Sequence, residues 1–232
     1  RHNPEFTMLE VYQAYGNYET MMELTEQCIV DAISASDQGL QLPYGDVTID
    51  FSPPFTRKTY DGLFLEQTGV SPNDAEAVKR LADQLGIETA DRHADVIKND
   101  VFEQAVEKTL KGPIFVMDYP ASICPLAKRS RDNSAVAERF ELFVEGMEIA
   151  NAYTELNDPD EQRDRFLKQS DGKEKGDENA SDVDWDYIRA LEYGMPPTAG
   201  EGIGIDRLAM LFTDSGSIRD VIFFPLLRKR KE

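Results

Sequence analysis

The sequence predicts one globular domain that mixes β-strands with α-helices, and three patterns along its 232 residues support this prediction. Residues 5–15 alternate as a strand does, residues 18–34 repeat apolar positions at helical steps, and residues 140–154 have the pattern of a β-hairpin. A chain of this size, 41% hydrophobic, can bury one sizeable core with a small inserted subdomain.

The first strand carries polar side chains on an otherwise apolar face. Phe6, Met8, Glu10 and Tyr12 lie two residues apart and therefore share one side of the strand. The two polar groups among them predict a strand that lines a pocket. The helix at residues 18–34 has apolar residues at three- and four-residue steps, so it should cover one face of a sheet.

The middle of the chain is divided by turn residues. Short strands over residues 41–55 are separated by proline-rich turns. Residues 72–111 predict a helical insertion, with a cap at Asn73-Asp74, a stop at Gly86 and a longer helix over residues 90–110. The remaining elements are a strand at residues 114–117, a polar helix at 158–168, a solvated loop at 170–184 and a helix at 187–193.

The hairpin carries two carboxylates, Glu141 on its first strand and Glu148 on its second. A tight turn at Glu145 would set them roughly opposite each other. Two close carboxylates repel unless a cation lies between them, and Mg²⁺ is commonly held by such a pair together with nucleotide phosphates. On spacing alone, two acidic residues on a hairpin are more often a wet surface.

The second hairpin strand also has the pattern of a pocket wall. Asn151, Tyr153 and Glu155 share one face, next to small alanines that leave room for a ligand. Glu148 is out of phase with this row, so a common site requires a β-bulge between Glu148 and Asn151. An edge strand with polar residues facing solvent remains the alternative for this segment.

A glycine-rich run, Gly200-x-Gly202-x-Gly204, precedes Arg207 and an apolar helix. Such a run lets a nucleotide approach the backbone closely, and an arginine at a strand-to-helix turn suits a phosphate. The run lacks the final glycine of the dinucleotide fingerprint and the Gly-Lys-Ser/Thr of a P-loop, so it predicts neither of those sites.

Composition excludes several other functions. A net charge of −19 repels phosphate backbones, so this chain alone is a poor nucleic-acid binder, and the basic residues at 228–231 are more often a solvated tail. No apolar run approaches the roughly 20 residues that cross a bilayer, and we expect a cytoplasmic protein without a membrane partner. Cys28 and Cys124 lie far apart in apolar contexts, which predicts buried free thiols.

Taken together, the segments resemble class II lysyl-tRNA synthetases. Residues 1–10 look like the second half of motif 2, and residues 139–143 with 148–158 look like the family's metal and lysine hairpin. Residues 200–207 look like motif 3, and residues 218–225 match the usual family ending. The resemblance covers nearly the whole chain, and three ordered motifs at family-like intervals are highly specific.

The resemblance implies an α+β fold, the class II aminoacyl-tRNA synthetase catalytic fold, built on an antiparallel sheet flanked by helices. It places the catalytic core in residues 1–71 and 112–232 and a helical insertion in residues 72–111. It implies an enzyme that activates L-lysine with ATP and Mg²⁺ to lysyl-adenylate and transfers the lysyl group to tRNA(Lys).

It also implies roles for single residues. Phe6 would stack on adenine, Arg207 would grip the phosphate, and Arg207, Glu141 and Glu148 would be catalytic. The ATP site would comprise His2, Asn3, Phe6, Glu141, Leu142, Gly204, Ile205, Asp206 and Arg207; the Mg²⁺ site Glu141 and Glu148; and the lysine site Glu10, Tyr12, Asn151, Tyr153 and Glu155.

The resemblance places the first residue inside motif 2. Motif 1, with its dimer interface, and the anticodon-binding domain would then precede this chain, so we expect the full-length protein to be a homodimer and this fragment to be inactive alone. Glu201 stands where relatives commonly have an apolar residue, and no role is predicted for it. Two alternatives are a synthetase-like lysine ligase that modifies a translation elongation factor and a non-catalytic synthetase-like binding module. Aspartyl- or asparaginyl-tRNA synthetase is disfavoured by Glu10 and Glu155.

Overall fold

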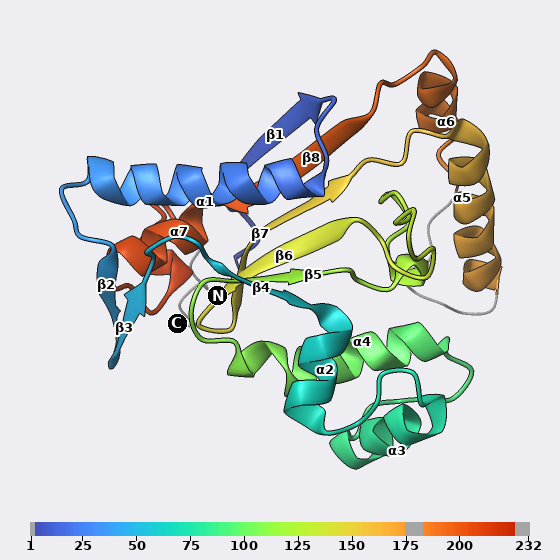
Figure 1. The fold of residues 1–232 in the computed structure, drawn as a ribbon, viewed down its shortest axis with the longest axis horizontal. Coiled ribbons are helices and arrows are strands. Elements are labelled where there is room, and N and C mark those ends of the chain that lie inside the picture. The colour runs from blue at the N-terminus through green and yellow to red at the C-terminus, as the bar shows by residue number, and fades with distance from the viewer. Residues whose placement is uncertain (1–2, 175–182, 226–232) are drawn as a thin grey trace, which may run out of the picture.

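The structure is a computed structural model that describes residues 3–174 and 183–225, with side chains described for 3–170 and 183–225. Its centre is a six-stranded sheet in the order β1-β8-β7-β6-β5-β4 (Figure 1). All neighbouring strands are antiparallel except β4 and β5, so the predicted antiparallel sheet is mixed at one edge. The strands are β1 (Met8–Ala14), β8 (Thr198–Gly204), β7 (Met147–Thr154), β6 (Arg139–Val144), β5 (Ile114–Met117) and β4 (Thr56–Thr59).

Helices and a small hairpin surround this sheet in Figure 1. The hairpin consists of β2 (Gln41–Tyr44) and β3 (Val47–Asp50). The helices are α1 (Tyr18–Ala35), α2 (Tyr60–Thr68), α3 (Ala75–Leu85), α4 (Ala94–Ala105), α5 (Pro159–Glu174), α6 (Trp185–Glu192) and α7 (Ile205–Phe212), with 3-10 turns at Glu107–Thr109, Ala121–Ile123 and Ile218–Asp220.

Helix α1 lies against the sheet and confirms the helix predicted at residues 18–34. Asn17 caps it: its side chain accepts from the Thr20 amide, and the Thr20 hydroxyl accepts from the Asn17 amide. Its buried face joins the largest apolar cluster, together with residues of β6, β7, β8 and α7. Cys28 is exposed and Cys124 is buried, so the predicted burial is wrong for Cys28, which lies outside the apolar stripe of α1.

The two faces of the sheet have different roles. On β7 and β8, Ala152, Ala199 and Ile203 point into the cluster that α1 covers. Their neighbours Gly200 and Gly202 alternate to the opposite face and line a pocket there. The pockets described below therefore lie across the sheet from α1.

Helices α2, α3 and α4 form a separate lobe (Figure 1), and their apolar residues pack with β5 in a second cluster. Asp74 caps α3 and Gly86, at φ 76°, ends it, as predicted. The predicted longer helix is shorter: α4 begins at Ala94, because His93 accepts from the Asp95 amide as an N-cap, and a 3-10 turn completes the stretch. The division into core and insertion stays a prediction.

Helices α5 and α6 pack together through Phe166 and Tyr187, whose ring centroids are 6.0 Å apart. The predicted polar helix at residues 158–168 continues to Glu174, so the predicted loop at 170–184 is wrong over its first five residues, where no proline or glycine pair interrupts the helix. Residues 175–182 of that loop and the basic tail at 228–231 lie outside the described residues.

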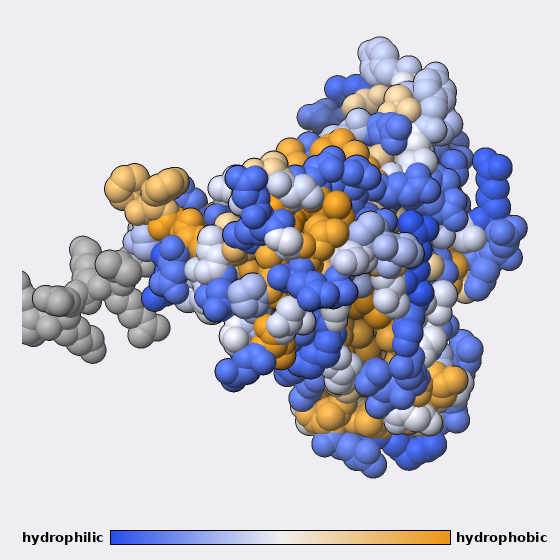
Figure 2. Space-filling model, turned by 60° about the vertical axis from the view of Figure 1, so that its left-hand side comes forward, coloured by the Kyte–Doolittle hydropathy of each residue, from blue (hydrophilic) through white to orange (hydrophobic). Residues whose placement is uncertain are grey.

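Strand β1 forms one edge of the sheet, and most of its residues are exposed. The apolar side chains of Met8 and Leu9 contribute to this edge, and Figure 2 shows apolar patches among hydrophilic residues on one face of the molecule. An exposed edge strand can pair with another strand. Within the described ranges, no helix is both long and apolar enough to cross a membrane.

Candidate active site

The β6–β7 hairpin has the predicted turn and the predicted bulge. Glu145 and Gly146 both have positive φ, 47° and 65°, as a tight two-residue turn requires. Leu142 pairs with Ala150 but Phe143 pairs with Glu148, so one extra residue of β7 is unpaired at this point. The bulge brings Glu148 to the pocket face of the sheet.

The predicted opposition of Glu141 and Glu148 is wrong, because the bulge shifts the register. Glu141 pairs with Asn151, and Glu148 pairs with Phe143. The two carboxylates are therefore diagonal neighbours across the hairpin, and both line the same cavity.

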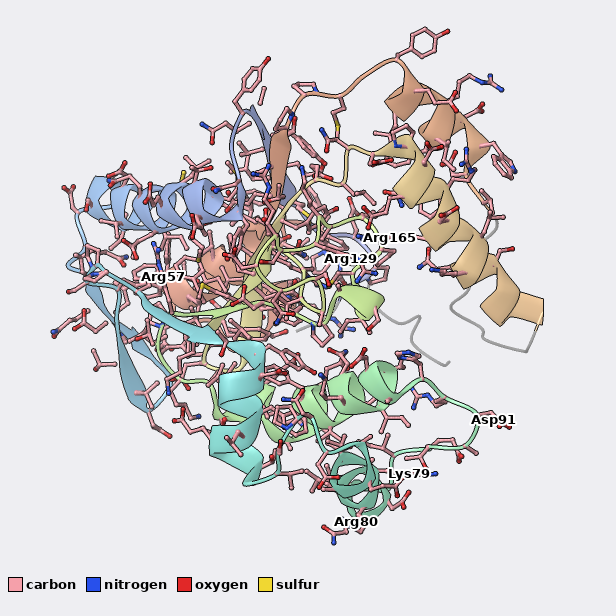
Figure 3. All side chains as sticks on the ribbon, turned by 45° about the vertical axis from the view of Figure 1, so that its right-hand side comes forward. Arg57, Lys79, Arg80, Asp91, Arg129 and Arg165 are labelled. Carbon is pink, nitrogen blue, oxygen red and sulfur yellow. The ribbon has the colours of Figure 1, made fainter. Side chains whose placement is uncertain are left out.

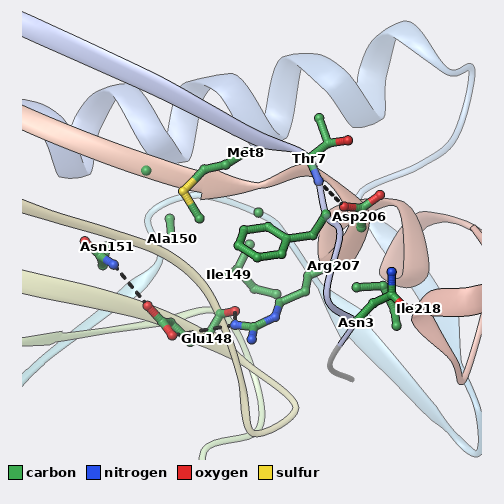
Figure 4. Close-up of a pocket in the computed structure, with 13 residues that line it drawn as sticks. Asn3, Thr7, Met8, Glu148, Ile149, Ala150, Asn151, Asp206, Arg207 and Ile218 are labelled. Atoms are coloured by element: carbon green, nitrogen blue, oxygen red, sulfur yellow. Dashed lines mark hydrogen bonds and ion pairs between the residues drawn. The ribbon is translucent and has the colours of Figure 1, made fainter. Parts of the chain in front are cut away.

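A first pocket, about 170 Å³ in volume, lies between the start of β1, β7 and α7. Figure 4 shows its labelled residues, with Arg207 extending toward Glu148. Seven residues with predicted roles in binding the nucleotide, the metal or lysine line it together: Asn3, Phe6, Glu148, Asn151, Gly204, Asp206 and Arg207. Residues 3–8 and 202–207 thus meet as the family motifs imply.

Arg207 belongs to the first turn of α7, directly after the glycine run. Its Nη1 donates to the Glu148 carbonyl and lies 3.6 Å from Glu148 Oε2, while Asn151 Nδ2 donates to Glu148 Oε1 at 3.2 Å. Its side chain remains 27% exposed, so guanidinium donors face the pocket. An arginine held in this way can present a planar fork to a phosphate.

A second pocket, about 130 Å³, adjoins the first, and Met8, Asn151 and Gly202 line both. All five residues predicted for lysine line it: Glu10, Tyr12, Asn151, Tyr153 and Glu155. The pocket thus combines two carboxylates with aromatic walls, which suits an ammonium group on an apolar stem.

Glu155 is the buried acid of this second pocket. It is 7% exposed, and burial raises the pKa of its carboxyl to about 7. Burial disfavours the charged form because a carboxylate loses its hydration. Tyr12, on β1, donates its hydroxyl to Glu10 at 3.2 Å, so the second carboxylate is positioned as well.

Gly200 forms the floor between Glu155 and Tyr12. A Cβ at this position would lie 2.2 Å from Glu155 Oε1 and 2.7 Å from Tyr12 Cε1. Any side chain here would fill the pocket or displace the acid. The glycine therefore provides space for a ligand and not a turn, since its φ is not positive.

The third cavity, about 290 Å³, is acidic. Glu141 and Glu148 line it together with Glu103 and Glu107 from the helical lobe. Burial raises the pKa of Glu141, with Glu148 adding to the shift and Arg139 opposing it. Burial and neighbouring carboxylates raise the pKa of Glu107 to about 7. This concentration of negative charge favours a cation.

Two neighbouring side chains position Glu141, and no sequence pattern predicted a role for either of them. Tyr119 donates its hydroxyl to Glu141 Oε2 at 2.7 Å, and Arg139 pairs with Glu141 Oε1. Arg139 lies two residues before Glu141 on the same strand, so the two-residue alternation could have placed it there. In the part of the chain that the structure describes, no three or more His, Cys, Asp or Glu side chains are grouped to hold a metal by themselves.

Some predicted contacts are not found at the pockets. The Leu142 side chain is buried in the cluster under α1, because strand alternation along β6 turns it away from the pockets. Its side chain therefore cannot contact ATP as predicted. Ile205 does not line the first pocket, and its amide donates to the Thr7 carbonyl. Asp206 lines the pocket, but its carboxylate accepts from the Thr7 amide. His2 lies outside the described residues.

Helix α5 supports the wall next to Glu155. Arg165 donates from Nη1 to the carbonyls of Cys124, Pro125 and Ala127, and Ala127 forms a β-bridge with Glu155. Arg129 and Arg165 both meet Glu161, and Figure 3 shows these two arginines near α5. The loop that flanks the buried acid is thereby tied to α5.

Comparison with known proteins agrees with this geometry. Residues 1–228 match the family described as class II tRNA synthetases (D, K and N), so the chain belongs to that family. Its most similar relatives include lysine–tRNA ligases. It is 48% identical to that of Aquifex aeolicus, over all of this chain and 40% of the relative. It is 47% identical to that of Magnetococcus marinus, over 99% of this chain and 47% of the relative. It is 49% identical to that of Thermoanaerobacter sp., over 100% of this chain and 47% of the relative.

The chain thus spans somewhat less than half the length of these curated relatives. The predicted family resemblance and the α+β class are confirmed. The roles of the individual site residues stay predictions.

Proposed function

We propose that this chain is the ATP- and lysine-binding part of the catalytic domain of a lysine–tRNA ligase. The observation that carries the proposal is the second pocket, where the buried acid Glu155 lies among Glu10, Tyr12 and Tyr153, next to the pocket that contains Arg207. The full-length protein would form lysyl-adenylate from L-lysine and ATP and pass the lysyl group to tRNA(Lys).

Glu155 selects the amino acid in this proposal. A bound lysine ammonium gives the buried carboxylate an ionic partner and lowers its pKa from about 7, so binding and ionisation are coupled. An aspartate side chain would meet Glu155 and Glu10 with like charge, and a neutral amide would leave Glu155 unpaired. Of the three amino acids in the family description, lysine therefore fits this pocket.

The first pocket would hold ATP with its α-phosphate near the second pocket. Phe6 is 59% exposed and lines the first pocket, so its ring is free to stack on adenine. Arg207 would contact the phosphate from the start of α7. Because Asn151 and Gly202 line both pockets, the lysine carboxylate and the phosphate would meet at their junction.

The residues of the acidic cavity fit Mg²⁺. Their donor set is hard carboxylate oxygen, from Glu141 and Glu148, in a cavity whose other acids have raised pKa values. Bound there with ATP, the ion would neutralise charge on the phosphates. Tyr119 and Arg139 would hold Glu141 in place, and Arg207 and Asn151 would hold Glu148.

The reaction needs no protein nucleophile. The lysine carboxylate attacks the α-phosphorus, and the bond to pyrophosphate breaks. The chain's contribution is to position both substrates and to neutralise developing charge through Arg207. The homodimer is proposed for the full-length protein.

The test is ATP–pyrophosphate exchange by the full-length protein with Mg²⁺. We expect exchange that depends on lysine and does not respond to aspartate or asparagine. Absence of exchange in a well-folded protein that still binds ATP would refute the catalytic proposal and leave a synthetase-like binding module. Transfer of the lysyl group to tRNA, or instead to an elongation factor, then separates the tRNA ligase from a protein-modifying lysine ligase.

A further inference from the structure

The centre of β8 contains a buried acid that the proposed reaction does not use. Glu201 lies between Gly200 and Gly202, whose backbones line the lysine pocket, but strand alternation turns its side chain to the face that α1 covers. It is 4% exposed. Its Oε2 has no hydrogen-bond partner, and no cation is paired with it among the described residues.

The other oxygen, Oε1, meets the hydroxyl of Thr25 on α1, which is itself fully buried. The same hydroxyl lies 2.6 Å from the Met21 carbonyl. A threonine hydroxyl has one proton, and a peptide carbonyl only accepts. Both contacts are satisfied at once when Thr25 donates to Met21 and the carboxyl of Glu201 carries a proton that it donates to Thr25.

The surroundings of Glu201 favour the neutral form. The strand residues paired with it are Val11 on β1 and Ala152 on β7, neither of which is charged. On α1, Cys28 is the titratable group near it, and Glu201 contributes to the raised pKa of that thiol. An ionised Glu201 would be a buried charge without a counter-ion, which proteins avoid by shifting the pKa.

We infer that Glu201 is held as an uncharged carboxylic acid that donates a hydrogen bond to Thr25, forming a proton-dependent link between β8 and α1. The link lies directly behind the floor of the lysine pocket. It makes Glu201 a positioning residue for β8, independent of which ligand the pocket binds.

The sign of the pH dependence follows. Burial raises the pKa of Glu201 from 4.5 to about 7. The folded state then binds more protons than the unfolded state between these values, so this group costs stability as pH rises from 4.5 to about 7. The cost corresponds to a shift on the order of a hundredfold in the unfolding equilibrium constant.

The experiment compares the full-length wild type with Glu201→Gln, which keeps the shape and a donor but cannot titrate, and with Glu201→Leu, which removes both. Denaturant unfolding is measured from about pH 5 to about pH 8. Relative to wild type, both variants should become more stable as pH rises, by a factor on the order of a hundred in the unfolding equilibrium constant. The stability of Glu201→Leu should differ from that of Glu201→Gln by an amount that does not change with pH. Parallel curves for wild type and variants would overturn the inference.

Infrared spectroscopy reports the proton directly. The difference spectrum between wild type and Glu201→Gln near pH 6 should contain the carbonyl stretch of a protonated carboxylic acid, and this band should vanish as pH rises. Glu23→Gln, which replaces an exposed acid on α1, is the matched control and should leave the carbonyl band of Glu201 in place. A carboxylate band for Glu201 near pH 6 would refute the proposal. Neither readout depends on lysine, ATP or catalysis.

Discussion

Replacing Glu155 by glutamine tests the lysine pocket most directly. The change keeps the side-chain volume but removes the charge that a lysine ammonium would pair with in a nearly inaccessible position, 7% exposed. A charge-assisted hydrogen bond contributes about 1.5–3 kcal/mol, and each 1.4 kcal/mol corresponds to about a factor of ten. We therefore expect kcat/KM for lysine to fall roughly 10- to 150-fold, with KM for ATP unchanged because Glu155 does not line the first pocket.

The assay is lysine-dependent ATP–pyrophosphate exchange by the full-length protein, with lysine and ATP varied separately. Glu23→Gln is the matched control, because Glu23 is an exposed acid on α1, across the sheet from the pockets. Denaturant unfolding excludes a folding defect. Since burial raises the pKa of Glu155 from 4.5 to about 7, the ionised group costs stability above that range, and the glutamine variant should be the more stable protein near pH 8.

Two results would refute this reasoning. An unchanged kcat/KM for lysine would mean that the ammonium binds elsewhere. An equal loss for lysine and ATP would mean that Glu155 supports the whole site and does not select the amino acid.

Further predictions concern the same pockets and use the same exchange assay. The apparent KM for lysine should be about tenfold higher at pH 6 than at pH 8, because below its pKa of about 7 Glu155 must lose a proton to bind the ammonium; a flat profile would contradict this. Gly200→Ala should raise KM for lysine at least about tenfold and leave KM for ATP unchanged, since the new Cβ would contact Glu155 and Tyr12; equal KM values for wild type and variant would contradict it. Arg207→Lys should lower kcat/KM for ATP by about 10- to 100-fold, because an ammonium lacks the planar fork; a loss confined to lysine would argue against a phosphate contact. Glu148→Gln should raise the Mg²⁺ concentration for half-maximal exchange several-fold, and an unchanged requirement would remove Glu148 from the metal site.

Much of the fold follows from local sequence patterns. The predicted strand at residues 114–117 matches β5, and the turn at Glu145 and Gly146 matches the hairpin, because hydrophobic alternation and turn chemistry act over a few residues. The parallel pairing of β4 with β5 could not be predicted, because no local pattern specifies which distant strand becomes a neighbour. The extension of the polar helix to Glu174 was missed because a solvated helix and a solvated loop have the same composition.

The site was predictable where residues alternate along one strand. Asn151, Tyr153 and Glu155 line one pocket as their spacing requires, and the need for a bulge after Glu148 followed from the same rule. What alternation cannot supply is the register across the hairpin, so the expected opposition of Glu141 to Glu148 was wrong. The acids that the helical lobe contributes to the third cavity could not be predicted either, because alternation along one strand does not show which distant residues lie next to it.

Glu155 and Glu201 show why a perturbed carboxyl does not by itself identify a site. Burial raises the pKa of each to about 7, and each lies on or beside β8. The two carboxyl groups differ in their surroundings. Glu155 faces a cavity with a glycine floor and aromatic walls, so a ligand can supply the missing positive charge. Glu201 faces α1 and a hydroxyl, so only its own proton can satisfy it. The same electrostatic cost therefore favours ligand binding on one face of the sheet and a pH-dependent packing contact on the other.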